Sequence, residues 1–356
     1  MPSATETTTV FVEGDALYEA MHVDLAGATR DARLECYIVA DDEVGGPMLT
    51  ALAALAQAGR RVQVRIDAVG SWRLIPPERV RALIAAGVQW HWSRPWSWRQ
   101  PGQFHVRNHR KLLVIDDAIA YVGGFNLDRR NSQRAVGAAR WRDTHVRLTG
   151  PRVAEAIRLF DEYPGAPRGP VPTARSPLAL LSNRSRRCRH RLRCAFTEAF
   201  DQARERLWLT TPYFAPDRRS QQALCGAARR GVDVRVLVPG KSDVPLAQWA
   251  ARAAYAHMLD AGVRIWEYQP RVLHAKTALV DQGWATVGTA NFDYRSFFLN
   301  DEINLLGQAP ALNATLAEHF VLDLAESREV LKAAWRQRPW YAPALELIGW
   351  WARRWL

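Results

Sequence analysis

Two segments of this chain repeat one set of polar residues at one spacing. Each has a histidine, a lysine two positions later, an aspartate five positions after the lysine, and an asparagine ten positions after the aspartate. The residues are His109, Lys111, Asp116 and Asn126, and then His274, Lys276, Asp281 and Asn291. Nine of the 22 positions from 109 to 130 are identical at the offset of 165. One such pattern would carry little information, whereas two aligned copies predict a duplicated functional site.

These side chains together suit a phosphoryl group. A lysine ammonium neutralises phosphate charge, and an asparagine amide donates hydrogen bonds to non-bridging oxygens. One neutral histidine can attack phosphorus while the other, protonated, gives a proton to the leaving alkoxide. Such a pair needs surroundings that tune the two pKa values apart. The pattern therefore predicts chemistry at a phosphoryl group.

The elements around each motif would have to bring these groups together. On a strand, residues i and i+2 point to the same face, so His109 and Lys111 are expected to share a face. The chain then runs apolar, is expected to turn at Asp116, and returns to Asn126 on a second strand. The later copy is expected to do the same. If the two halves pack about a pseudo-two-fold axis, the two sets face one another.

The rest of the chain alternates between strand and helix patterns. In the first half, strands are expected at 32–40, 60–71 and near 88–92, with helices at 47–59 and from 76 to Gly87. The same order recurs about 170 residues later. We therefore predict an α/β protein of two similar α/β/α repeats, with mixed, largely parallel sheets flanked by helices and one active site at the interface of the repeats. The expected parts are an N-terminal repeat at 1–165, a Pro/Arg-rich linker at 166–183, a C-terminal repeat at 184–330 and a Trp/Arg-rich amphipathic tail at 331–356.

The duplicated pattern resembles the phospholipase D superfamily. Within it, "RNHRKLLVIDDAIAYVGGFN", "LHAKTALVD", "WATVGTANFDYRS" and "NDEIN" are similar to bacterial cardiolipin synthases, most closely to those lacking N-terminal transmembrane helices. The resemblance implies a phosphohistidine intermediate, no cofactor and no metal. It makes His109 the nucleophile and His274 the general acid, although the repeats are too alike for the sequence to fix that order.

The resemblance also assigns supporting roles. Lys111, Lys276, Asn126 and Asn291 would hold the phosphate. Asp143 would fix the tautomer of His109, and Glu302 that of His274, through the other ring nitrogen. Asp116 and Asp281 are included with the catalytic set but are expected to brace it. Thr289 could contact phosphate, although its counterpart is Gly124.

The implied function is phosphatidyl transfer between phospholipids, with cardiolipin made from phosphatidylglycerol. Hydrolysis by water would instead make the protein a phospholipase. A metal-independent nuclease or phosphodiesterase is the other alternative, since the net charge of +12 suits nucleic acid as well as an anionic membrane. We expect anionic phospholipids and the membrane surface as partners, with no obligatory nucleic acid. The oligomeric state stays open.

Tryptophans favour the lipid alternative. Nine of the 15 lie in two stretches, "WHWSRPWSW" at 90–98 and "WRQRPWYAPALELIGWWARRWL" at 335–356. Tryptophan prefers the membrane interface. No apolar run is long enough to span a bilayer, so we expect a peripheral protein on the cytoplasmic face of the membrane. The tail either docks on the membrane, packs on its own domain or joins a dimer contact.

Overall fold

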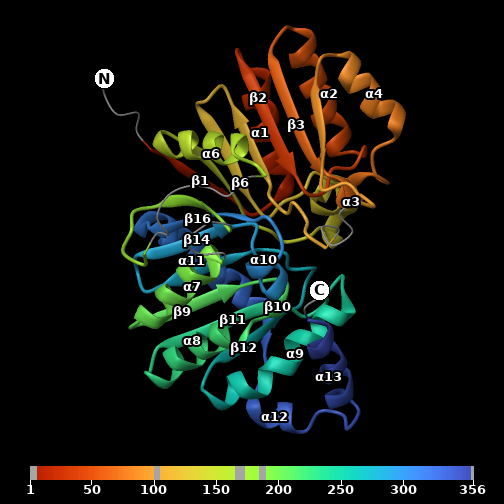
Figure 1. The fold of residues 1–356 in the computed structure, drawn as a ribbon. Coiled ribbons are helices and arrows are strands. Elements are labelled where there is room, and N and C mark those ends of the chain that lie inside the picture. The colour runs from red at the N-terminus through yellow and green to blue at the C-terminus, as the bar shows by residue number, and fades with distance from the viewer. Residues whose placement is uncertain (1–5, 100–104, 165–172, 184–189, 354–356) are drawn as a thin grey trace. The chain divides into compact units, whose positions relative to one another are not determined.

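The computed structural model describes residues 6–99, 105–164, 173–183 and 190–353, which form two compact units (Figure 1). The N-terminal unit comprises Met1–Pro167 together with Leu299–Ile303. The C-terminal unit comprises Arg168–Phe298 and Asn304–Leu356. Part of the predicted linker lies outside the described residues, as do most of the arginine-rich segment "RSRRCRHRLRC" at 184–194 and the last three residues of the tail. The short segment 299–303 is therefore encoded in the second repeat but belongs to the first unit.

The N-terminal unit is built on a seven-stranded sheet with the order β1-β7-β6-β5-β2-β3-β4. Its strands are β1 (Thr8–Phe11), β2 (Asp31–Cys36), β3 (Arg61–Asp67), β4 (Gln89–Ser93), β5 (Leu112–Ile115), β6 (Ile119–Gly123) and β7 (His145–Thr149). Strands β2, β3 and β4 are parallel, as their helical crossovers require. Every other pairing in this sheet is antiparallel.

The prediction of mixed sheets is confirmed, but the prediction that they are largely parallel is wrong. Each motif strand enters a hairpin with a three-residue turn, and so short a connection can join only antiparallel strands. Asp116 and Asp117 adopt φ values of 53° and 54° in the first hairpin, and Asp281 adopts 50° in the second. Aspartate tolerates this left-handed region better than most residues, which suits it to such turns.

Helices cover the sheet of the N-terminal unit. They are α1 (Gly14–Ala26), α2 (Gly45–Gln57), α3 (Ala68–Ser71), α4 (Pro77–Ala85), α5 (Gln133–Val136) and α6 (Pro151–Asp161), with short 3₁₀ turns at Arg129–Asn131 and Gly137–Ala139. Buried residues of α1, α2 and α4 share one apolar core with Leu113 and Ile115 of β5. Helix α6 packs against β5, β6 and β7. The hairpin that follows the first motif is therefore held in the centre of this unit.

The C-terminal unit repeats this plan with an eight-stranded sheet in the order β17-β12-β11-β9-β13-β14-β16-β8. Its strands are β8 (Ala179–Ser182), β9 (Arg206–Thr210), β11 (Asp233–Pro239), β12 (Arg264–Tyr268), β13 (Thr277–Val280), β14 (Trp284–Gly288), β16 (Ile303–Gln308) and β17 (Ser327–Glu329). Strands β9, β11 and β12 are parallel, and β9, β13, β14 and β16 pair antiparallel in that order. A separate parallel pair joins β10 (Phe214–Ala215) and β15 (Phe292–Asp293).

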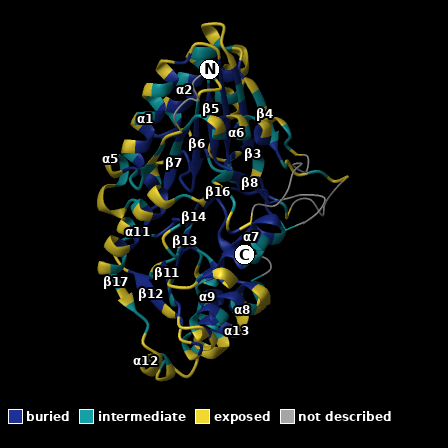
Figure 2. Cartoon of the chain, turned by 90° about the vertical axis from the view of Figure 1, so that its left-hand side faces the viewer, coloured by how far each residue is buried: buried dark blue, intermediate teal, exposed yellow. Residues whose placement is uncertain are grey.

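Seven helices belong to the described part of the C-terminal unit, and some of them begin with a proline or a capping aspartate. They are α7 (Arg191–Gln202), α8 (Arg218–Arg229), α9 (Pro245–Asp260), α10 (Tyr294–Phe298), α11 (Pro310–Ala325), α12 (Lys332–Arg336) and α13 (Ala342–Ala352). Proline opens α9 and α11, where its missing N–H costs nothing. The Asp217 side chain caps α8 by accepting from the Arg219 N–H. Figure 2 shows the result: strands are mostly buried and the outward helix faces are exposed.

Helix α13, in the predicted tail, packs against α9. The two helices approach so closely at Gly349 that a Cβ there would lie 2.4 Å from the backbone nitrogen of Ala250. Of the alternatives for the tail, the described part therefore adopts packing on its own domain. Its outer face still exposes Leu347, Ile348 and Trp351. Within the described part of the chain, no helix is long and apolar enough to cross a membrane.

Candidate active site

The first motif lies just before its strand. His109 and Lys111 were expected on a strand, but β5 begins only at Leu112. The preceding backbone is bonded elsewhere: His109 N–H donates to the Asp301 carbonyl (2.9 Å), and Asn108 forms an isolated parallel bridge with Asp301. Lys111 Nζ donates to the His109 carbonyl at 2.9 Å. The histidine and lysine are thus neighbours, although not through the strand geometry that was expected.

A buried carboxylate orients His109. The Nδ1 atom lies 2.9 and 3.1 Å from the two oxygens of Glu302, whose residue is fully buried. A carboxylate accepts, so Nδ1 carries the proton and Nε2 keeps its lone pair for chemistry. The Tyr37 ring packs edge-on against the imidazole, with centroids 4.9 Å apart and an interplanar angle of 65°. His109 is therefore fixed in both tautomer and orientation.

The predicted partners of the histidines need correction. Glu302 was assigned to His274 because it follows that histidine in the second repeat, and Asp143 was assigned to His109. The structure places Glu302 in the N-terminal unit, on His109 Nδ1. The predicted pairing of Glu302 with His274 is therefore wrong, and Glu302 takes the position at His109 that was predicted for Asp143. The reason lies in the chain topology: the segment Leu299–Ile303, just at the start of β16, belongs to the N-terminal unit although the second repeat encodes it.

Asp143 lies in the same unit as His109. Its Oδ1 accepts from the Thr144 N–H at 2.7 Å, and its carboxylate occupies the space beside Gly124. A Cβ at Gly124 would lie only 1.9 Å from that oxygen. This contact explains why the first repeat has glycine where the second has Thr289, which is also fully buried.

The second motif repeats the first at close range. His274 and Lys276 are both buried and precede β13. Lys276 Nζ lies 2.7 Å from His274 Nδ1 and also donates to the His274 carbonyl. Tyr213 packs edge-on to His274, with centroids 6.4 Å apart and an interplanar angle of 82°. Each motif histidine thus has a lysine two residues later and a tyrosine ring beside it.

The buried lysine of the first motif is electrostatically supported. Burial lowers the pKa of Lys111, and the negative charges of Glu302 and Asp143 act in the opposite direction. The Tyr37 ring also lies 5.4 Å from its ammonium. A buried cation next to an oriented histidine is suited to an anionic substrate.

Asn126 and Asn291 each follow the strand that pairs with the motif strand of their repeat. Asn126 follows β6 and is buried, and its Oδ1 accepts from the Ile38 N–H at 3.2 Å. This leaves the amide nitrogen as the group that can donate to a phosphate. Asn291 is buried after β14, its backbone N–H donates to Ser296 Oγ (3.0 Å), and its Oδ1 has no hydrogen-bond partner among the described residues.

Asp116 and Asp281 lie at the far ends of their strands from the histidines. The Asp116 carboxylate accepts from three backbone N–H groups, those of Thr29, Arg30 and Asp31, at 2.6, 2.8 and 3.0 Å. Burial acts to raise the pKa of Asp116, but these bonds outweigh it and lower the value from 3.8 to about 2. A catalytic role for either aspartate has no geometric support, while bracing remains the prediction.

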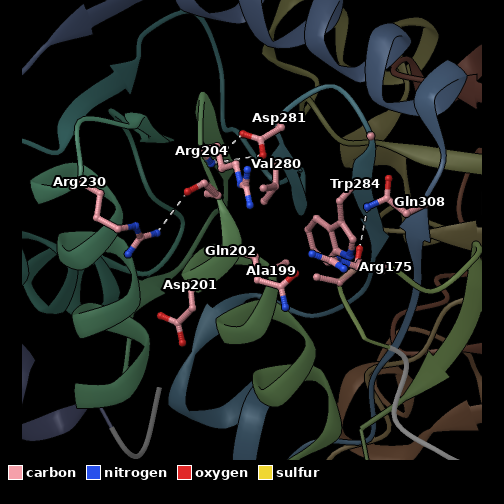
Figure 3. Close-up of a pocket in the computed structure, with 13 residues that line it drawn as sticks. Arg175, Ala199, Asp201, Gln202, Arg204, Arg230, Val280, Asp281, Trp284 and Gln308 are labelled. Carbon is pink, nitrogen blue, oxygen red and sulfur yellow. Dashed lines mark hydrogen bonds between the residues drawn. The ribbon is translucent and has the colours of Figure 1, made fainter.

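Asp281 makes the equivalent contacts in the C-terminal unit. Its carboxylate accepts from the backbone N–H groups of Arg204, Glu205 and Arg206. A pocket of about 560 Å³ opens at this turn, lined in part by Arg175, and Figure 3 shows the Asp281 contact there. The length of β13 separates this pocket from His274, so its position does not mark the chemistry.

A layer of buried polar residues beneath His109 was not predicted as such. Asp67 accepts from the Asn108 N–H (2.8 Å), and the Asn108 amide donates to Glu35 (2.7 Å). Burial raises the pKa of Asp67, partly offset by the positive charge of Arg107. Glu35 therefore supports the backbone next to His109 and also forms an ion pair with Arg65, whose Nη1 lies 3.5 Å from Glu35 Oε1.

Tyr37 was also missed. The available signal was a tyrosine shortly after β2 and another shortly after β9, in "ECYIVADD" and "TPYFAPD". In the part of the chain that the structure describes, no group of three or more His, Cys, Asp or Glu is arranged to hold a metal ion.

Known proteins share this architecture. The family model described as cardiolipin synthase, PLD-like domain matches residues 23–158 and 196–324. Cardiolipin synthase A of Pseudomonas fluorescens Pf-5 is 34% identical over 346 residues, covering 94% of this chain and 72% of that protein. Minor cardiolipin synthase ClsB of Bacillus subtilis is also 34% identical, covering 93% of this chain and 86% of that protein.

A solved structure, phosphatidylserine synthase of Haemophilus influenzae, matches with a TM-score of 0.77 at 14% identity and covers 98% of this chain and 95% of that one. The duplicated fold and its paired motifs define a protein of the phospholipase D class. Within that class, the chain belongs to the cardiolipin synthase, PLD-like domain family.

Proposed function

We propose that this protein transfers phosphatidyl groups between phospholipids and makes cardiolipin from phosphatidylglycerol. The observation that carries the proposal is the oriented, carboxylate-bound His109 beside buried Lys111, in a chain of the cardiolipin synthase family. The relatives with 34% identity bear that name over nearly all of this chain.

In the proposed first step, Nε2 of His109 attacks the phosphorus of one phosphatidylglycerol. A nitrogen–phosphorus bond forms, the bond to the glycerol headgroup breaks, and His274 gives a proton to the leaving oxygen. In the second step, His274 takes the proton from the hydroxyl of another phosphatidylglycerol. That oxygen attacks phosphorus, the bond to His109 breaks, and cardiolipin is released.

We assign the remaining site residues to phosphate binding and orientation. The ammonium groups of Lys111 and Lys276 neutralise the non-bridging oxygens, and the amides of Asn126 and Asn291 donate to them. Thr289 adds a hydroxyl from the second repeat alone. Glu302 stabilises the positive ring that forms when Nε2 of His109 carries phosphorus, because the Glu302 carboxylate contacts Nδ1, the other ring nitrogen.

We also propose that the protein works as a peripheral protein on the cytoplasmic face of the membrane. Its net charge of +12 supports binding to an anionic leaflet. Fractionation of cells should recover it with membranes at low salt, and high salt should release part of it.

The test is incubation of the purified protein with phosphatidylglycerol vesicles, followed by mass analysis of the lipids and of released glycerol. Cardiolipin and glycerol in equal amounts are expected, with none from a His109→Ala variant. Phosphatidic acid as the main product would show hydrolysis instead. Absence of both lipids would overturn the proposed function.

A further inference from the structure

Two segments leave the sheet of the N-terminal unit side by side. Strands β3 and β4 are parallel, and their last residues, Asp67 and Ser93, are paired in register. The segments that follow, 68–74 and 94–99, therefore start from the same edge of the sheet. Five large apolar side chains on them are exposed, namely Val69 (39%), Trp72 (57%), Leu74 (43%), Trp96 (65%) and Trp98 (71%).

This surface, here named the aromatic rim, is basic as well as apolar. The guanidinium of Arg73 lies 4.9 Å from the Trp72 ring, and that of Arg99 lies 5.2 Å from the Trp98 ring. Neither segment contains an aspartate or glutamate. Single exposed apolar residues are ordinary, but three tryptophans with arginines and no acid match the interface of an anionic bilayer.

The aromatic rim is fixed to the residues that hold His109. Arg94, at the base of segment 94–99, bonds the Asp301 carboxylate at 2.6 Å, and Asp301 directly precedes Glu302. The Arg94 carbonyl also accepts from the Arg107 guanidinium at 3.1 Å. On the other segment's side, Asp67 at the end of β3 accepts from the Asn108 N–H. The residues at the base of the aromatic rim are thus hydrogen-bonded to the residues that flank His109 and Glu302.

We propose that the aromatic rim is the surface on which this protein docks to an anionic lipid bilayer. Docking there places headgroup phosphates beside His109 while the acyl chains stay in the bilayer. The inference rests on the proposed function, because it assumes a lipid substrate. It adds which surface meets the membrane, and it distinguishes the rim from the exposed face of α13, which has no described contact with a motif residue.

The experiment compares two sets of substitutions in the full chain. The rim variant carries Trp72→Ala, Trp96→Ala and Trp98→Ala, and the control carries Trp340→Ala and Trp351→Ala, which are 90% and 78% exposed on the C-terminal unit. Co-sedimentation measures binding to phosphatidylglycerol vesicles and to phosphatidylcholine vesicles. Turnover is measured on the same phosphatidylglycerol vesicles and on a short-chain phosphatidylglycerol kept monomeric.

The rim variant should bind phosphatidylglycerol vesicles about tenfold or more weakly, because each tryptophan loses apolar burial at the interface. Its turnover should fall on vesicles but hold on the monomeric lipid, and the control should match the unaltered protein. Equal vesicle binding by the rim variant, or loss of binding by the control alone, would overturn the inference. If the unaltered protein turned over neither lipid, the proposed function would fail, while vesicle binding would still decide the role of the rim.

Discussion

The contact between His109 and Glu302 leads to a quantitative prediction for Glu302→Gln. The glutamine has the same size, and its amide oxygen can still accept from Nδ1, so the fold and the tautomer should survive. What is lost is the negative charge 2.9 Å from the ring that becomes positive when Nε2 binds phosphorus. A hydrogen bond to a charged group contributes about 1.5–3 kcal/mol. At about 1.4 kcal/mol per tenfold change, kcat should fall about 10- to 150-fold.

The Michaelis constant should change little, because Glu302 is fully buried behind the histidine. The assay is steady-state conversion of phosphatidylglycerol, with rapid quenching to measure phosphorylation of the peptide that contains His109. A matched control is Glu267→Gln, another buried glutamate that pairs with Arg252 and Arg328 in the C-terminal unit. It should lower stability without lowering kcat of the folded fraction. A folded Glu302→Gln enzyme with kcat within about twofold of the unaltered protein would refute the reasoning.

Other predictions concern the framework. Asp116→Asn should lower the free energy of unfolding by about 1 kcal/mol after allowance for solvent screening. The pKa of Asp116 is near 2 in the folded protein, below its unfolded value of 3.8. Urea titrations should therefore show the full difference in unfolding free energy above about pH 5, and the difference should disappear as the pH falls towards 2. Gly124→Ala should displace the Asp143 carboxylate, whose negative charge supports the Lys111 ammonium, and should lower turnover while circular dichroism still shows a folded chain. Gly349→Ala should loosen α13 from α9, seen as faster proteolysis of the tail, whereas Gly226→Ala in α8, which has room, should stabilise by up to about 1 kcal/mol in thermal melts.

The sequence was sufficient for features that depend on local pattern and duplication. Both hairpins turn where Asp116 and Asp281 predicted, because polar residues there interrupt two apolar runs. The strand–helix–strand–helix–strand order over residues 32–92, and its copy in the second repeat, also followed from periodicity. The largely parallel sheet was a wrong expectation, since it extended the β3–β4 relation to hairpins that cannot adopt it.

Long-range contacts could not be predicted in the same way. The spacing from a histidine to a carboxylate suggested a partner within the same repeat, but Glu302 contacts the histidine of the other repeat. The tryptophan count was also ambiguous, because Trp90 and Trp92 lie partly buried against the core while Trp96 and Trp98 are exposed. Only the fold separates an interior aromatic from one that faces solvent.

The segment Leu299–Ile303 has a consequence for the order in which the protein is made. It completes the N-terminal unit, yet the ribosome synthesises it after six of the eight strands of the C-terminal sheet. A nascent chain that has already folded around His109 therefore has no carboxylate on Nδ1 until residue 302 emerges. During most of translation, His109 therefore lacks the Glu302 carboxylate that orients it. A product truncated before residue 302 would carry the first motif without its activity.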